Sequence, residues 1–142
     1  MTAKLSPREQ GDIGERAAAV WLLSNANAYV FFPFGHSPDF DLVADMEGRL
    51  VRVQVKTSTV HLKNGRYEVT LATRGGNRSW NGLVKRFSSS RCDFLFVLVA
   101  DGRQWFIPAA DVEGGSAIIV GGPKYAAYEV DPGQAIATMR SS

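Results

Sequence analysis

The N-terminal part of the chain carries apolar residues at a helical period, and residues typical of helix starts come before them. Ser6 can cap the helix, Pro7 suits its first position, and Glu9 stands three residues after the cap. Apolar positions then recur on one side at Ile13, Ala17, Val20, Trp21 and Leu22. The pattern predicts a helix over residues 6–25.

Two glycines and a glutamate stand out inside this predicted helix. Glycine lowers helix propensity, so Gly11 and Gly14 predict a close approach of backbone or ligand. Glu15 shares a stripe with Gly11, Ala18 and Leu22, all small or apolar. A carboxylate in that setting is expected to face a cation. The alternative is a solvated glutamate near the positive end of the helix dipole.

Alternating and continuous apolar runs predict the strands of a sheet. The clearest pair, 39–45 and 50–57, flanks a tight turn at Glu47-Gly48. Further strands are predicted at 28–33, 67–72, 93–100 and 104–107, with weaker ones at 117–120 and 125–130. A helical turn at 108–112, a short helix near 83–87 and a tail helix over 132–139 complete the set. This order predicts an α/β or α+β fold with helices packed on a sheet.

The composition is that of a globular protein. Of the 142 residues, 45% are hydrophobic and 11% aromatic, so we expect a single domain over residues 1–142. No apolar run reaches the roughly 18 residues of a membrane span, and the N-terminus lacks the hydrophobic segment of a signal peptide. The one cysteine, Cys92, has no second cysteine for an internal disulfide. Together these features predict a cytoplasmic protein.

The formal charge of +2 conceals an uneven distribution of charged residues. Residues 49–91, here called the basic segment, carry ten Lys or Arg and a single acid, Glu68. The remainder carries six bases and thirteen acids. Clustered bases with few local acids favour a polyanionic partner.

The predicted hairpin brings polar side chains together. Its turn sets a register in which residue numbers across the two strands sum to about 95, so Asp41 lies opposite Gln54 and Asp39 opposite Lys56. Alternation places Val51, Val53 and Val55 on one face and Arg52, Gln54 and Lys56 on the other; Phe40 and Leu42 share the face opposite Asp39 and Asp41. Carboxylates, an amide and an ammonium then converge on a patch suited to one metal ion and one phosphate. The alternative is an exposed hairpin with complementary polar pairs.

Other site chemistries fit the sequence poorly. His36, His61 and Cys92 do not have the spacing of a zinc site. The chain contains no P-loop, no G-x-G-x-x-G and no G-x-S-x-G string.

The hairpin residues resemble a known family. Pro38-Asp39, Asp41 and Gln54-Val55-Lys56 resemble the motif of the PD-(D/E)-x-K nuclease superfamily, in the variant with glutamine at the second acidic position. The string from Asp41 to Ser58 is similar to the members associated with group I introns, and Gly11-Asp12-Ile13-Gly14-Glu15 resembles the first-helix glutamate motif. The resemblance implies an α/β fold with a restriction-endonuclease-like core, a mixed central sheet flanked by helices in the order αβββαβ.

The resemblance also implies roles for individual residues. Asp41 would be the principal metal ligand, with the backbone carbonyl of Val55 and the carboxylate of Glu15 as further ligands, and Lys56 would position or activate the attacking water. The metal would be Mg²⁺, with Mn²⁺ able to substitute. Gln54 would belong to the catalytic set but brings no charge, so either the metal is held more weakly or Asp39 supplies the missing ligand.

The expected partner is DNA. Residues expected to contact it are Arg52, Lys63, Arg66, Arg74, Asn77, Arg78, Trp80, Lys85 and Arg86. The predicted function is metal-dependent hydrolysis of DNA phosphodiester bonds by an endonuclease of homing or repair type. Alternatives are a nuclease specific for Holliday junctions, mismatches or uracil-containing DNA, and a non-catalytic DNA-binding module. Because double-strand cleavage is simplest with two symmetry-related sites, we expect a homo-dimer or higher homo-oligomer.

Overall fold

The computed structural model describes residues 4–35, 37, 39–74 and 84–136. Its one α-helix within these ranges is α1 (Pro7–Asn25), and short 3-10 turns occur at Lys63–Gly65, Ala109–Val112 and Ala126–Tyr128. The first strands are β1 (Tyr29–Phe31), β2 (Leu42–Met46), β3 (Arg49–Ser58), β4 (Val60–His61), β5 (Tyr67–Thr70), β6 (Thr73–Arg74) and β7 (Val84–Lys85). The later strands are β8 (Phe94–Val99), β9 (Gln104–Pro108), β10 (Ala117–Val120) and β11 (Glu129–Val130). No helix in these ranges is long and apolar enough to cross a bilayer.

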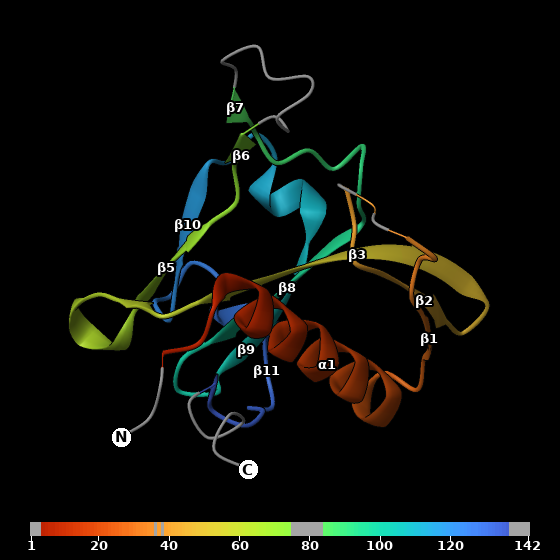
Figure 1. Cartoon of the computed structure of the whole chain (residues 1–142), viewed down its shortest axis with the longest axis horizontal. Coiled ribbons are helices and arrows are strands. Elements are labelled where there is room, and N and C mark those ends of the chain that lie inside the picture. The colour runs from red at the N-terminus through yellow and green to blue at the C-terminus, as the bar shows by residue number, and fades with distance from the viewer. Residues whose placement is uncertain (1–3, 36, 38, 75–83, 137–142) are drawn as a thin grey trace.

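A six-stranded mixed sheet forms the centre of the fold, in the order β1-β2-β3-β8-β9-β11 (Figure 1). The pair β3–β8 is parallel, and the other neighbours are antiparallel. β3 and β8 therefore lie in the middle of the sheet. The apolar side chains of β8 alternate between its two faces, whereas Val51, Val53 and Val55 of β3 all face α1. The predicted α/β fold with a mixed central sheet is confirmed.

The hairpin between β2 and β3 has the predicted register. Leu42 pairs with Val53 and Asp45 with Leu50. Positive φ angles at Glu47 (55°) and Gly48 (86°) make the tight turn, and the Gly48 N–H donates to Asp45 Oδ1 at 2.8 Å. A turn of this hand matches the twist of the strands that it joins.

The first strand of the hairpin begins later than predicted. It starts at Leu42 rather than at residue 39, and the ladder does not extend to the expected pair of Asp39 with Lys56. Phe40 packs against the cluster on one face of the sheet, whereas Leu42 is buried in the cluster on the other, so the prediction that they share a face is wrong. The alternation fails because the chain before Leu42 leaves the extended conformation.

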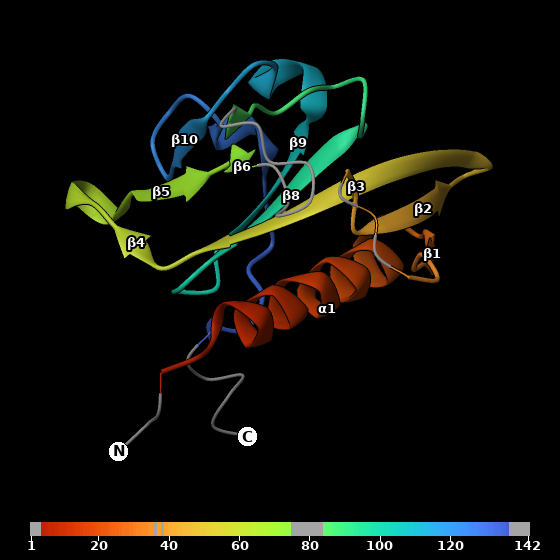
Figure 2. The ribbon, with the colours of Figure 1, turned by 45° about the horizontal axis from the view of Figure 1, so that its top comes forward.

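The two faces of the sheet are covered differently. α1 packs along one face (Figure 2), over a core that includes Leu42, Val53 and Phe96. On the other face Leu95, Val97 and Trp105 pack under a small antiparallel sheet of β10, β5 and β4. In the described part of the chain, therefore, a helix flanks one face and a second sheet the other.

The prediction of a short helix near 83–87 is wrong from residue 84 onward, because Val84 and Lys85 pair with Arg74 and Thr73 as an antiparallel ladder. The tail helix predicted over 132–139 falls partly outside the described residues. Residues 132–135 are irregular. Two backbone hydrogen bonds fix this segment: the Gly133 N–H donates to the Gly102 carbonyl, and the Ile136 N–H donates to the Ala100 carbonyl.

α1 has the predicted N-terminus and approaches β3 closely. The Ser6 side chain and Glu9 cap each other's backbone N–H groups at 3.1 Å. A Cβ built at Gly14 would lie 2.5 Å from Thr57 Cγ2 and 3.2 Å from Val55 Cγ1, so the expected close approach is confirmed there. At Gly11 no other part of the chain lies within 4 Å, so a close backbone approach is not seen there. Gly14 therefore sets the distance between helix and sheet.

Gly14→Ala and Gly11→Ala should change stability in opposite directions. The methyl at residue 14 overpacks against Thr57, and we expect a loss of about 1–3 kcal/mol in the free energy of unfolding. At residue 11 the space is open, so higher helix propensity should stabilise the protein by up to about 1 kcal/mol. Urea unfolding of both variants measures the difference. Equal effects would contradict the packing role of Gly14.

Candidate active site

Asp41 is held at the edge of β3 by two hydrogen bonds. Its backbone N–H donates to the Val53 carbonyl at 2.9 Å, and its Oδ2 accepts the N–H of Val55 at 2.7 Å. The carboxylate thus takes the place of a backbone partner just past the last ladder pair, Leu42 with Val53. Asp41 is positioned by the central strand and not by its own loop alone.

The backbone carbonyl of Val55 lies on the same edge of β3 as Asp41. In a strand the N–H and C=O of one residue point to the same side, and the Val55 N–H points to Asp41. The ladder between β2 and β3 ends before residue 55. This carbonyl therefore lies on the edge where the resemblance to the nuclease superfamily expects a metal ligand.

Glu15 and Asp41 line one pocket. The cavity, of about 190 Å³, is also lined by Phe32, Pro33 and Gly35, and by Ser37 and Phe40. Glu15 is half-buried and follows Gly14, the point at which α1 comes closest to β3. The structure therefore brings together two carboxylates that are 26 positions apart in the sequence.

Lys56 follows Val55 on β3, so its side chain leaves the strand on the face opposite to that of Val55. Burial lowers the pKa of the Lys56 ammonium, and the negative charge of Asp41 partly opposes that shift. Asp41 is thus within electrostatic reach of Lys56 while its carboxylate also borders the pocket of Glu15. A lysine with a lowered pKa is better able to exchange a proton near neutral pH.

Asp39 and Gln54 are not among the residues that line the pocket of Asp41 and Glu15. The backbone N–H of Asp39 donates to Ser37 Oγ at 3.3 Å. Gln54 is half-buried on the strand between Val53 and Val55. The negative charge of Asp39 acts instead on Cys92, where it helps to raise the pKa of the thiol.

Cys92 lies beneath the site, which the sequence did not indicate. Its side chain is buried in the core cluster that Phe40 also contacts. Burial raises the pKa of the Cys92 thiol to about 11; Arg52 opposes the shift, and the negative charges of Asp93, Asp39 and Asp41 add to it. The thiol is therefore protonated at neutral pH and serves as core packing beside the carboxylates.

The donor set fits a hard divalent cation. No group of three or more His, Cys, Asp or Glu side chains in the described ranges forms a metal cluster. Two carboxylates at one pocket and a backbone carbonyl on the same strand edge suit an ion such as Mg²⁺, which binds one or two carboxylates and keeps several waters. All of these groups offer oxygen atoms.

Arg52 is engaged inside the protein. Its side chain forms an ion pair with Asp93 at 3.3 Å and donates to the Ser90 carbonyl at 3.2 Å. Its backbone N–H also donates to Asp93 Oδ2 at 2.8 Å, and the Asp93 N–H returns a bond to the Arg52 carbonyl. The acid that pairs with this base comes from outside the basic segment and joins the start of β8 to β3.

The other predicted DNA contacts are spread over several elements. Lys63, Arg66 and Arg86 are exposed. Arg74 and Lys85 belong to the paired strands β6 and β7. Asn77, Arg78 and Trp80 lie outside the described residues.

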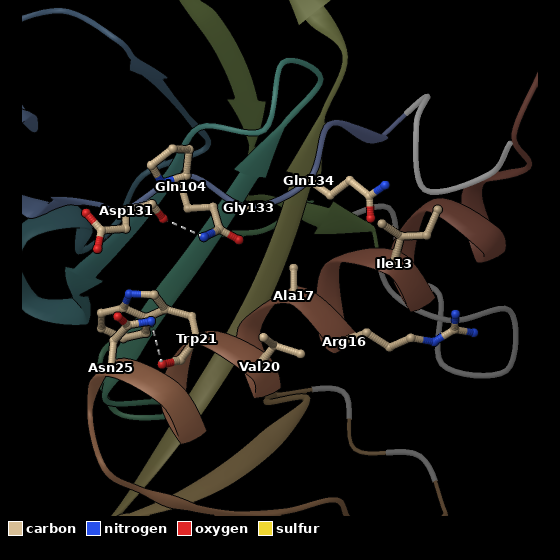
Figure 3. Close-up of a pocket in the computed structure, with 11 residues that line it drawn as sticks. Ile13, Arg16, Ala17, Val20, Trp21, Asn25, Gln104, Asp131, Gly133 and Gln134 are labelled. Atoms are coloured by element: carbon tan, nitrogen blue, oxygen red, sulfur yellow. Dashed lines mark hydrogen bonds between the residues drawn. The ribbon is translucent and has the colours of Figure 1, made fainter. Parts of the chain in front are cut away.

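A second pocket lies on another flank of α1 (Figure 3). It measures about 410 Å³ between α1 and the segment Asp131–Gln134. Gln104 donates from Nε2 to the Asp131 carbonyl at 2.8 Å there, and its Oε1 is buried without a hydrogen-bond partner. None of the predicted site residues lines this pocket.

Comparison with known proteins agrees with this geometry. The sequence model of the PD-(D/E)XK endonuclease family matches residues 5–124. The chain belongs to this family. The match spans α1, the β2–β3 hairpin and the central strands, and so includes every residue of the candidate site. Endonucleases of this family generally use divalent metal ions.

Solved structures extend the comparison. The structure of a bacterial homing endonuclease is similar, with a TM-score of 0.73 and 29% sequence identity over 88% of this chain and 89% of that chain. The fold is therefore restriction-endonuclease-like, as the resemblance implied. The crystal structure of MepB aligns with a TM-score of 0.43 and 13% identity over 73% of this chain and 78% of that one. A search of curated proteins returned no match.

Asp41→Asn should lower the pKa of Lys56 further. The substitution removes the negative charge that partly offsets the effect of burial on the ammonium, and burial remains. An NMR titration that follows the Lys56 side-chain Cε measures the shift. Asp45→Asn, on the same hairpin, is the matched control and should leave the titration unchanged. A higher Lys56 pKa in Asp41→Asn would contradict the proximity of the two groups.

Proposed function

We propose that this protein is a metal-dependent DNA endonuclease that hydrolyses phosphodiester bonds. The observation that carries the proposal is the placement of Asp41, bound to the Val55 N–H, beside Glu15 in one pocket and within electrostatic reach of Lys56. Membership of the endonuclease family supports the reaction class.

Asp41, Glu15 and the Val55 carbonyl would hold the metal. Asp41 is the principal ligand, because the Val55 N–H orients its carboxylate before any substrate is bound. Asp39 is the further candidate that the sequence suggests, since Gln54 brings no charge to the site. The bound cation, proposed as Mg²⁺ or Mn²⁺, would lower the pKa of a water and stabilise charge on the reacting phosphate.

Lys56 would hold the attacking water or take its proton at Nζ. Burial lowers the pKa of this amine, so the neutral form that accepts a proton is easier to reach than for a lysine in water. In its charged form the same group offsets negative charge on the phosphate in the transition state. Gln54, on the same strand, would orient the water or phosphate through its amide.

DNA is the proposed substrate, and the basic segment the proposed contact surface. Exposed basic side chains at Lys63, Arg66 and Arg86 can neutralise phosphates. Further proposed contacts are Arg74, Asn77, Arg78, Trp80 and Lys85. Arg52 would act mainly through Asp93, since its guanidinium is already paired. We propose a homo-dimer or higher oligomer in the cytoplasm, because two symmetry-related sites suit double-strand cleavage.

The similar bacterial structure favours a homing-type activity over a repair-type one, because that protein is a homing endonuclease. A structure- or lesion-specific nuclease acting on junctions, mismatches or uracil-containing DNA is the alternative within the same chemistry. A non-catalytic DNA-binding module is the alternative outside it, favoured by the neutral Gln54 in place of an acid.

Cleavage of supercoiled, branched, mismatched and uracil-containing DNA with Mg²⁺ or Mn²⁺ tests the proposal. Wild type should cut at least one substrate, and Lys56→Ala should bind it while cutting about 100- to 10,000-fold more slowly. Asp41→Asn and Glu15→Gln should lose a similar factor, because each removes a charge from the metal site. EDTA should abolish cutting.

Matched variants control for charge alone. Lys124→Ala, Asp45→Asn and Glu47→Gln change the same residue types away from the pocket and should cut at the wild-type rate. Equal residual cleavage in Lys56→Ala and Lys124→Ala would contradict the role of Lys56. DNA binding by wild type without any cleavage would favour the non-catalytic module.

DNA binding should weaken steeply with salt, since each neutralised phosphate releases counterions. The double variant Arg66→Gln, Arg86→Gln should bind less tightly and reduce the slope of log K against log salt by about 1–2. Arg16→Gln, an exposed base on α1 outside the basic segment, is the control and should keep the wild-type slope. Fluorescence anisotropy at several salt concentrations measures the affinity. A wild-type affinity for DNA that does not change with salt would contradict contacts between the basic segment and phosphates.

A further inference from the structure

An aromatic turn forms one rim of the candidate active site. Phe32, Pro33 and Gly35 line the same 190 Å³ pocket as Glu15 and Asp41. We call Phe32–Gly35 the rim segment. Because this segment lines the pocket that holds the Asp41 carboxylate, under the proposed function it lies beside a phosphodiester bound there.

Phe34 projects from this rim into solvent. The residue is fully exposed, whereas Phe32 is 55% exposed. Pro33 before it restricts the backbone, and Gly35 after it adopts a φ of +96°, which favours glycine. The ring therefore stands clear of its neighbours, with both faces free to stack on another flat group.

The charge of this region indicates which part of DNA the ring would meet. Residues 17–48 contain no Lys or Arg, whereas the basic segment begins at Arg49. Lys and Arg side chains bind phosphates, whereas Asp39, Asp41, Asp45 and Glu47 in this stretch of the chain repel them, so an aromatic ring there gains more from a nucleobase. The rim segment is thus suited to the base stack, while the basic segment follows the backbone.

We propose that Phe34 inserts between neighbouring bases of the DNA next to the bond that is cut. This inference rests on the proposed nuclease function and adds how the substrate is distorted and positioned. An apolar side chain inserted into a base step unstacks it and kinks the duplex. The kink would bend the scissile phosphate towards Asp41 and Glu15. Flexible pyrimidine–purine steps would be favoured there, since they unstack at least cost.

The test uses a duplex that spans the position cut by wild type in the cleavage panel, with 2-aminopurine at each base step around it. Binding is measured in EDTA, which withholds the metal and keeps the DNA intact. Wild type should raise 2-aminopurine fluorescence at one step beside the cut. Phe34→Ala should lose that rise and bind about 5- to 100-fold more weakly, whereas Phe34→Trp should retain both.

Leu23→Ala is the matched control, since Leu23 is 54% exposed on α1 and does not line the pocket. Phe34→Ala should fold normally because the ring it removes has no protein surroundings. Fluorescence and affinity equal to those of Leu23→Ala would overturn the insertion, with nuclease activity of the wild type left standing. A change in self-association with unchanged DNA binding, measured by sedimentation, would also overturn it. A wild type that cuts no DNA overturns the proposed function itself.

Discussion

The hydrogen bond from the Val55 backbone N–H to the Asp41 carboxylate is the contact on which the candidate site depends. β3 is paired on both edges and covered on both faces, so the position of Val55 is set by the core. Through its hydrogen bond to Val55, the Asp41 carboxylate is positioned by β3, although Asp41 lies just before the start of β2. The same contact ends the ladder with β2, and the chain before Leu42 turns away and leaves room for the pocket.

The close packing of α1 on β3 completes this arrangement. Because Gly14 has no side chain, the helix backbone comes within contact of Val55 and Thr57, and Gln10 adds a 3.0 Å hydrogen bond from its amide to Thr57 Oγ1. Glu15 follows Gly14 in the chain and reaches the pocket of Asp41. One strand thus positions the proposed metal ligands in two ways, through its backbone edge and through the face that it offers to the helix.

Electrostatics divide the basic residues by role. Lys56 is partly buried beside Asp41, and burial lowers its pKa, whereas Arg52 keeps its charge in an ion pair with Asp93. Part of the positive charge in the basic segment therefore stabilises the sheet. The exposed lysines and arginines of the basic segment are the ones that remain available to contact phosphates. The rim segment Phe32–Gly35, by contrast, carries aromatic surface and no charge, so in the proposed complex it would meet the nucleobases and not the phosphates.

The sequence alone determined the features that depend on local patterns. The capped start of α1, the register of the β2–β3 hairpin and its turn follow from side-chain period and turn residues, which act over a few positions. The tertiary structure decided where β2 begins, that β7 replaces a helix, and that a second sheet covers one face. It also brought Glu15, Asp41 and the aromatic rim to one pocket. These depend on packing and hydrogen bonds between distant residues, whose energies no local pattern encodes.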